Sequence, residues 1–67
     1  MKKDYFKVEV TNQWDDVELS EAYHYFSAAY EEYNFEIKER IGNGGIKVTL
    51  YSLNDDGSQK ELMHCQF

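Results

Sequence analysis

The chain begins with a short segment in which apolar and polar residues alternate. Phe6, Val8 and Val10 fall on one face of an extended backbone, and the residues between them fall on the other. Alternation with a period of two is typical of a strand that buries one face. The polar run NQWDD at 12–16 ends the pattern. We therefore predict a half-buried strand before this run.

A helical pattern follows. Asp15 and Glu18 have the spacing of a capping box, with an acidic residue three positions after the N-cap. Apolar residues then recur at steps of three and four, which places them on one stripe of a helix. We expect a helix that begins at Asp15 and continues to Tyr33. Its apolar stripe consists of Leu19, Ala22, Tyr23, Phe26, Ala29, Tyr30 and Tyr33.

Residues 35–41, FEIKERI, fit two patterns. Ile37 and Ile41 continue the helical stripe, but the same segment also alternates as a strand does. Asn34 is a suitable residue for a helix end, and the GNGG run at 42–45 is a strong turn signal. We favour a strand for this segment, paired with the next strand across the glycine-rich turn.

The remaining segments indicate two further strands. IKVTLYSL at 46–53 and KELMHCQF at 60–67 flank NDDG, which has the composition of a hairpin turn. The expected fold class is α+β, a two-layer βαβββ arrangement with one helix packed on a small, mainly antiparallel sheet. Because the chain has 67 residues and no linker-like stretch, we expect a single domain over residues 1–67.

Composition narrows the class of protein. Hydrophobic residues make up 42% of the chain and aromatic residues 16%, which is too rich in core material for a disordered tail. The net charge of −6 argues against direct binding to nucleic acid, where neutralisation of phosphates supplies most of the affinity. A single cysteine and the lack of a long apolar run predict a cytoplasmic protein without a membrane segment.

The acidic residues are concentrated in one stretch. Residues 15–33 contain six acids and no lysine or arginine, so this stretch accounts for all of the net charge. Two interpretations stay open, a solvated face that keeps the protein soluble or a surface that binds a basic region of another protein. Tyr25 lies off the apolar stripe and is a candidate anchor, because tyrosine is enriched in interfaces. The candidate partner-binding residues are Asp15, Asp16, Glu18, Glu21, Tyr25, Glu31 and Glu32.

No residue pattern indicates catalysis, a metal site or a cofactor. His64 and Cys65 are adjacent, so on a strand they point to opposite faces and cannot share a metal ion. Cys65 instead fits the core-facing alternation of Met63, Cys65 and Phe67. We expect a protein that is not an enzyme and has no metal and no cofactor.

Two alternatives to helix-mediated binding remain. One helix covers one face of a sheet, so the outer face would expose Tyr51 among basic residues, an arrangement that can bind RNA or another single strand. Those basic residues are Lys7, Lys38, Arg40 and Lys47. The other alternative is a small structural homodimer, which the apolar residue Phe67 and the small core would favour.

In its size, its acidity and its stretch of acids and tyrosines at 15–33, the chain resembles the small acidic inhibitor proteins of phages and mobile elements. Anti-CRISPR and DNA-mimic proteins belong to this group. The resemblance covers the whole chain in general style. It implies a protein that inhibits a nuclease or defence protein in the host cytoplasm, with its acidic residues engaging lysines and arginines where phosphates would lie.

Overall fold

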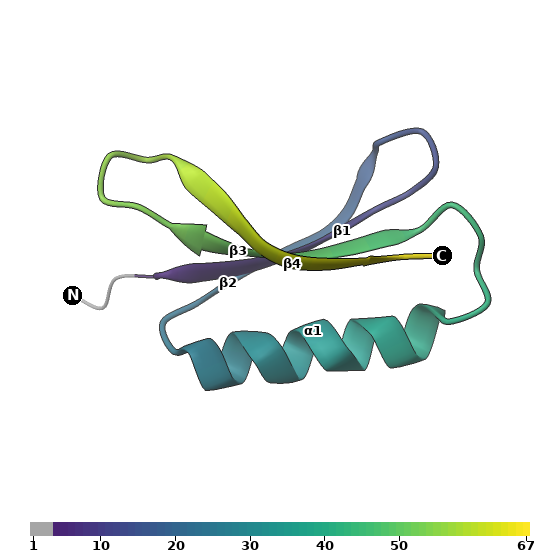
Figure 1. The fold of residues 1–67 in the computed structure, drawn as a ribbon, viewed down its shortest axis with the longest axis horizontal. Coiled ribbons are helices and arrows are strands. Elements are labelled where there is room, and N and C mark those ends of the chain that lie inside the picture. The colour runs from purple at the N-terminus through teal and green to yellow at the C-terminus, as the bar shows by residue number, and fades with distance from the viewer. Residues whose placement is uncertain (1–3) are drawn as a thin grey trace.

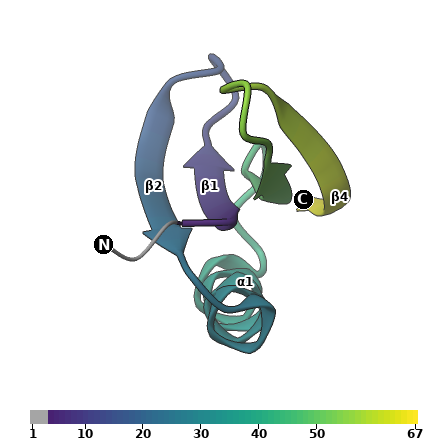
Figure 2. The same ribbon diagram turned by 90° about the vertical axis from the view of Figure 1, so that its left-hand side faces the viewer.

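The computed structural model describes residues 4–67, which form one helix and one sheet. The strands are β1 (Phe6–Thr11), β2 (Val17–Tyr23), β3 (Lys47–Leu53) and β4 (Gln59–Gln66), and the helix is α1 (Phe26–Arg40). The strands are antiparallel in the order β2-β1-β3-β4, and the helix covers one face of the sheet (Figure 1, Figure 2). The predicted α+β two-layer fold is confirmed, but the elements follow the order ββαββ rather than βαβββ.

Residues 17–23 form a strand, so the prediction of a helix that begins at Asp15 is wrong. In the turn before β2, the side chain of Asn12 accepts hydrogen bonds from the backbone N–H groups of Trp14 and Asp16, at 2.9 and 3.0 Å. This side chain closes the turn and lets β2 run back along β1. The four-residue spacing between Leu19 and Tyr23 is an even number, so it places both side chains on one side of a strand as well as of a helix.

The helix occupies residues 26–40, so the favoured strand at 35–41 is also wrong. The chain leaves the helix at Ile41, and Gly42 follows with a φ of 93°, a left-handed conformation that glycine adopts without steric cost. The glycine run therefore ends a helix and leads into β3, instead of joining two strands of a hairpin. The buried helix residues recur at the spacing of one helix face, and they are Ala29, Tyr33 and Glu36.

β3 and β4 form the hairpin that the sequence predicts. The Asn54 N–H donates to the Ser58 carbonyl at 2.8 Å, and the Asp56 carboxylate accepts from the Ser58 N–H at 2.9 Å. The register of β3 and β4 shifts after Leu50, which leaves Leu62 as an extra residue in β4. The NDDG segment is thus the turn that its composition indicates.

The core lies between the two central strands and the helix. Ala29 is small and fully buried, which allows α1 to pack closely beneath β1 and β3. Met63 and Phe67 pack at the margin of the core, and Cys65 lies opposite Val48 on the same face, so the predicted core-facing alternation of β4 is confirmed. The fully buried side chains of the sheet are Val8, Val10, Val48 and Leu50.

Candidate functional site

The side of the molecule where β2 lies beside α1 carries three neighbouring carboxyl groups. Glu21 lies opposite the buried Val8 in the sheet, so its side chain projects from the face that the helix covers. Glu32 and Glu36 are one turn apart on α1. Burial raises the pKa of Tyr23, and the charges of Glu32, Glu21 and Glu36 raise it further, which places all three near one ring. We call Glu21, Glu32 and Glu36 the acidic row.

The pKa of the Glu32 carboxyl group is raised by its surroundings in this row. Burial raises its pKa above the ordinary value of 4.5, and a hydrogen bond to Glu36 and the charges of Glu36 and Glu21 raise it further. A hydrogen bond between two carboxyl groups requires a proton between them, so these neighbours favour the protonated form of Glu32. The like charges within the row, though not its burial, would also attract a basic side chain.

Arg40, at the end of α1, balances part of this charge. Its Nε donates a hydrogen bond to Glu36 Oε1 at 2.8 Å, and its Nη1 donates to Glu18 Oε1 at 2.9 Å. The hydrogen bond to Glu36 is the main reason that the pKa of Arg40 is raised, so the guanidinium stays charged. One cation is thus shared by two carboxylates, and within residues 4–67 neither Glu21 nor Glu32 forms an ion pair.

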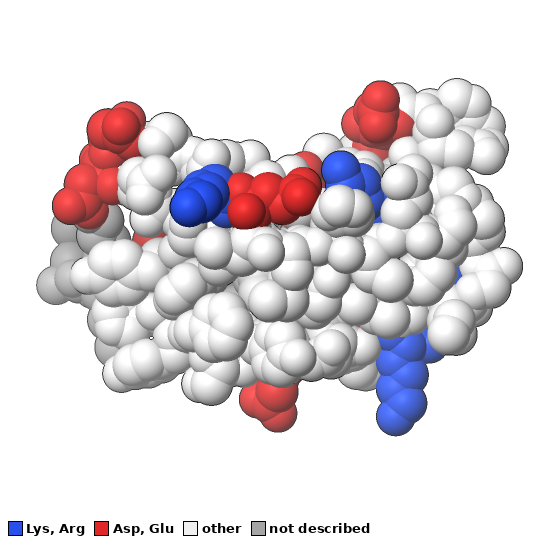
Figure 3. Space-filling model, viewed as in Figure 1, with Lys and Arg blue, Asp and Glu red and all other residues white. Residues whose placement is uncertain are grey.

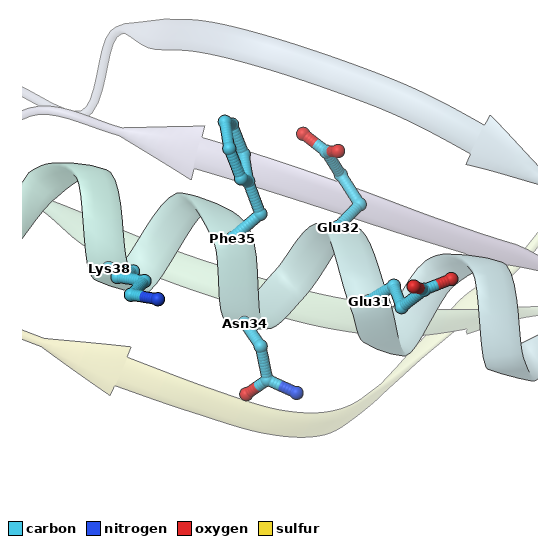
Figure 4. Close-up of a pocket in the computed structure, with 5 residues that line it drawn as sticks. All are labelled: Glu31, Glu32, Asn34, Phe35 and Lys38. Atoms are coloured by element: carbon cyan, nitrogen blue, oxygen red, sulfur yellow. The ribbon is translucent and has the colours of Figure 1, made fainter.

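A shallow groove of about 410 Å³ runs over the solvent-facing side of α1, next to the acidic row. Glu32 and Phe35 project from the β2 side of the helix and Asn34 from the β4 side (Figure 4). The Phe35 side chain is 51% exposed, so an apolar ring lies beside the carboxylates. A long basic side chain fits such a surface, because its methylene groups can cover the ring while its charged end reaches an acid. The groove is lined by Glu31, Glu32, Asn34, Phe35 and Lys38.

The structure separates the acidic residues that the sequence groups on one helix. Glu21 and Glu32 lie together in the acidic row, and Glu31 lines the adjacent groove. Glu18 is engaged by Arg40. The remaining two acids lie in the turn between β1 and β2, and they are Asp15 and Asp16.

Tyr25 is exposed, as its place off the apolar stripe predicts. It is the N-cap residue of α1, its side chain is 61% exposed, and its ring packs edge-on against His24 at a centroid distance of 4.6 Å. It lies before the first helical turn, whereas Glu32, the first α1 residue of the acidic row, lies about two turns later. Tyr25 therefore flanks the acidic row and does not lie within it.

Sequence analysis misses two residues of this site, Phe35 and Glu36, because it places both in a strand. The signal that could have found them is the interval of four between Glu32, Glu36 and Arg40. This interval is the spacing of side-chain pairs on a helix, with the acid before the base in the favourable order. The alternation of apolar and polar residues at 35–41 favours a strand instead, and this is why the segment is predicted as one.

The outer face of the sheet differs from the basic surface that would bind RNA. Lys38 and Arg40 lie on α1 instead of on this face, which corrects two of the four basic positions. Lys7 is engaged by Gln59 at 2.7 Å, by Glu9 at 3.2 Å and by the ring of Tyr51 at 5.0 Å. Lys47 lies 3.9 Å from Glu61. The bases that remain on this face are therefore paired with acids.

Two further features bear on chemistry. Among residues 4–67, no group of three or more histidine, cysteine, aspartate or glutamate side chains is arranged to hold a metal ion. In the same part of the chain, no helix has the length and apolar character needed to cross a membrane.

Comparison with models of known protein families, with curated proteins and with solved structures found no significant match.

Proposed function

We propose that this protein is a non-enzymatic protein-binding module that uses the acidic row and the α1 groove to bind a basic surface of another protein. The observation that carries the proposal is the imbalance of charge on this side. Arg40 is held by Glu36 and Glu18, whereas Glu21, Glu31 and Glu32 have no basic partner among the described residues. A partner's lysine or arginine would supply the missing cation.

The energetics of the row support this reading. Like charges one helical turn apart destabilise a helix by about 0.2–0.5 kcal/mol, so local stability alone does not favour Glu32 beside Glu36. Burial raises the pKa of Glu32, and the same repulsion raises it further. A bound cation would relieve the repulsion, and the free energy released would contribute to affinity for the partner.

The groove supplies an apolar contact beside the charges. Charged residues at the edge of an interface mainly steer encounter, whereas a few buried aromatic side chains supply most of the affinity. Phe35 is the exposed aromatic residue in the groove, and Tyr25 is a second exposed ring at the start of α1. We assign the anchor role to Phe35 first, because it lies directly beside Glu31 and Glu32.

The resemblance to small acidic inhibitors implies a class of partner. It would be a nucleic-acid-handling or defence protein of a host cell, such as a nuclease whose basic channel normally holds phosphates. The carboxylates of Glu21, Glu31 and Glu32 would then occupy positions that phosphates take. This role places the protein in the host cytoplasm.

The proposal is tested by affinity capture from cell lysate with the tagged full chain, washed at low and then at high salt. The test variant is Glu31→Lys with Glu32→Lys, and the control is Asp4→Lys with Asp55→Lys, which changes the net charge equally at exposed positions away from the groove. We expect one stoichiometric partner that salt weakens and that the groove variant loses. Equal loss in both variants would refute the groove as the binding site, since overall charge would then explain the capture.

A further inference from the structure

The sheet has two free edges, and they are protected differently. The β2 edge carries Glu18 and Glu21 and an irregularity in its pairing with β1, features that discourage a second strand from adding there. β4 has a bulge and a lysine in its first half only. Its second half pairs with β3 without a register shift, and this half together with Phe67, residues 63–67, contains no lysine, arginine, aspartate or glutamate. This half of β4 is an unprotected edge.

The hydrogen bonds of Phe67 fix which backbone groups of β4 face outward. Its N–H donates to the Ile46 carbonyl at 2.9 Å, and its carbonyl accepts from the Gly45 N–H at 2.8 Å, so both groups face β3. Backbone groups alternate in direction along a strand. The N–H and carbonyl groups of Gln66 and His64 therefore point away from the sheet, where no strand of the described chain lies beside them.

The surface beside this edge is uncharged and aromatic. β4 lies in front in the view of Figure 1, and the same view in Figure 3 shows a broad band without charged residues below β4 and over α1. Phe26 stacks on Tyr30 at a centroid distance of 5.6 Å, and Tyr30 stacks on Tyr33 at 6.3 Å. Phe26 and Tyr30 are each 43% exposed. The β4 side thus contrasts with the acidic β2 side.

We propose that a second copy of this chain binds here, with the two β4 strands paired antiparallel about a two-fold axis at Cys65. In this register His64 lies opposite Gln66 of the partner subunit, and the outward backbone groups of both strands form hydrogen bonds. Met63 lies opposite the partner's Phe67, so the apolar margins of the two cores cover each other. No charged residue enters the paired segment 63–67.

Charge decides where a second copy can bind. Each chain has a net charge of −6, which opposes self-association, so two copies can meet only through a surface from which the acids are absent. Because β2 is the opposite edge strand, the two β2 strands become the outer edges of an eight-stranded sheet. Seven strand spacings of about 4.8 Å then separate them by roughly 34 Å, which exceeds a Debye length of about 8 Å. Repulsion between the acidic rows is therefore screened.

The dimensions fit as well. The molecule measures 38 × 21 × 17 Å, so the rectangle that encloses its broad face is about 800 Å², comparable in size with the area that each partner buries in a standard interface. In the continuous sheet the two helices lie about four strand spacings, or ~19 Å, apart. Tyr33 is only 6% exposed and belongs to the core, so the exposed rings of Phe26 and Tyr30 line this space from each side.

The test is sedimentation equilibrium of the full chain over a range of concentrations, with proline placed at either sheet edge. His64→Pro removes an outward N–H of β4, and Ser20→Pro removes an outward N–H of β2, since the Tyr23 carbonyl faces β1 and backbone groups alternate from there. Proline is tolerated in edge strands where the N–H faces solvent. We expect a dimer whose dissociation constant rises at least tenfold in His64→Pro and is unchanged in Ser20→Pro. A monomer at every concentration, or equal weakening by both variants, would overturn the proposal.

A second measurement needs no proline. Diamide takes up two hydrogens as two thiols join in a disulfide, and the proposed register places Cys65 directly opposite the partner's Cys65, about 4.5 Å apart at Cα, within disulfide range. We expect rapid formation of a covalent dimer by the unaltered chain. The comparison is Cys65→Ser with Ser20→Cys, which moves the thiol to the more exposed β2 edge. Faster crosslinking of that variant would contradict β4 pairing.

Discussion

Replacement of Arg40 by methionine tests how the acidic row is held in the folded protein. Glu36 is only 6% exposed and depends on the Arg40 guanidinium, whose Nε lies 2.8 Å from its carboxylate. Methionine keeps much of the length of the side chain and removes its charge. The Arg40→Met variant therefore leaves a nearly buried carboxylate beside Glu32 without its cation.

The size of the effect follows from burial. Removing one partner of a fully buried ion pair costs about 3–5 kcal/mol. The Arg40 side chain is 26% exposed, so water can reach part of the vacated space and solvate Glu36. We therefore expect a loss of about 2 kcal/mol in the free energy of unfolding, near the value for a hydrogen bond to a charged group. The ion pair with the more exposed Glu18 should add little to this loss.

The assay is urea denaturation at pH 7 followed by far-ultraviolet circular dichroism. Fluorescence is a poor probe, because Trp14 is 72% exposed in the folded state already. The matched control is Lys38→Met, which removes a positive charge from the same last turn of α1, on the solvent side. Both variants lose a favourable interaction with the helix dipole of about 0.3–1 kcal/mol, so their difference isolates the ion pair.

Equal losses of unfolding free energy in Arg40→Met and Lys38→Met would show that the ion pair with Glu36 does not stabilise the fold. A double variant tests whether the unpaired Glu36 carboxylate causes the loss of stability. Glu36→Met in the Arg40→Met background removes the stranded carboxylate, and replacement of an ion pair by apolar residues of similar volume is often neutral. We therefore expect the double variant to recover most of the lost stability.

Two other predictions concern the loop after α1 and the acidic row. Gly45 has a φ of +86° and an added Cβ would lie 2.6 Å from the Gln13 Cβ, so Gly45→Ala should cost roughly 2–3 kcal/mol in thermal or urea unfolding. Gly42→Ala, with a positive φ but open space, should cost about 1 kcal/mol, and Gly44→Ala should be neutral; any other ranking would contradict the structure. For Glu32 the pKa in the folded protein is raised, so the stability linked to its protonation is present below pH 4.5 and is lost as pH rises. The free energy of unfolding of Glu32→Gln should therefore be about 0.5 kcal/mol higher than that of the parent protein at pH 7, and this difference should vanish in acid. A difference that does not depend on pH would show that Glu32 is not the titrating group.

Several features follow from the sequence because their causes are local. The alternation around Val8 predicts β1, and the NDDG turn predicts the β3–β4 hairpin, since both depend on neighbouring residues. The core-facing positions of β4 follow from the same two-residue period. These elements suffice for the α+β class, because three strands and one helix leave few other arrangements.

The position of the helix could not be predicted from local sequence pattern. Leu19 and Tyr23, or Ile37 and Ile41, have a spacing of four that fits both a helix and a strand, and in these segments the local pattern favours the wrong structure. The outcome is settled by partners distant in sequence. Val17–Tyr23 becomes a strand because β1 offers its free edge and Asn12 closes the turn. The helix then extends to Arg40, where Gly42 ends it.

The candidate site shows the same division. Composition alone determined that residues 15–33 carry the excess negative charge. Only the tertiary structure decided which acids meet. Strand pairing turns Glu21 toward the helix, and helix packing brings Glu32 and Glu36 against it, while Asp15 and Asp16 remain in a turn. The physical reason is that charge is a property of each residue, whereas proximity between Glu21 and Glu36 exists only after β2 and α1 have packed on one core.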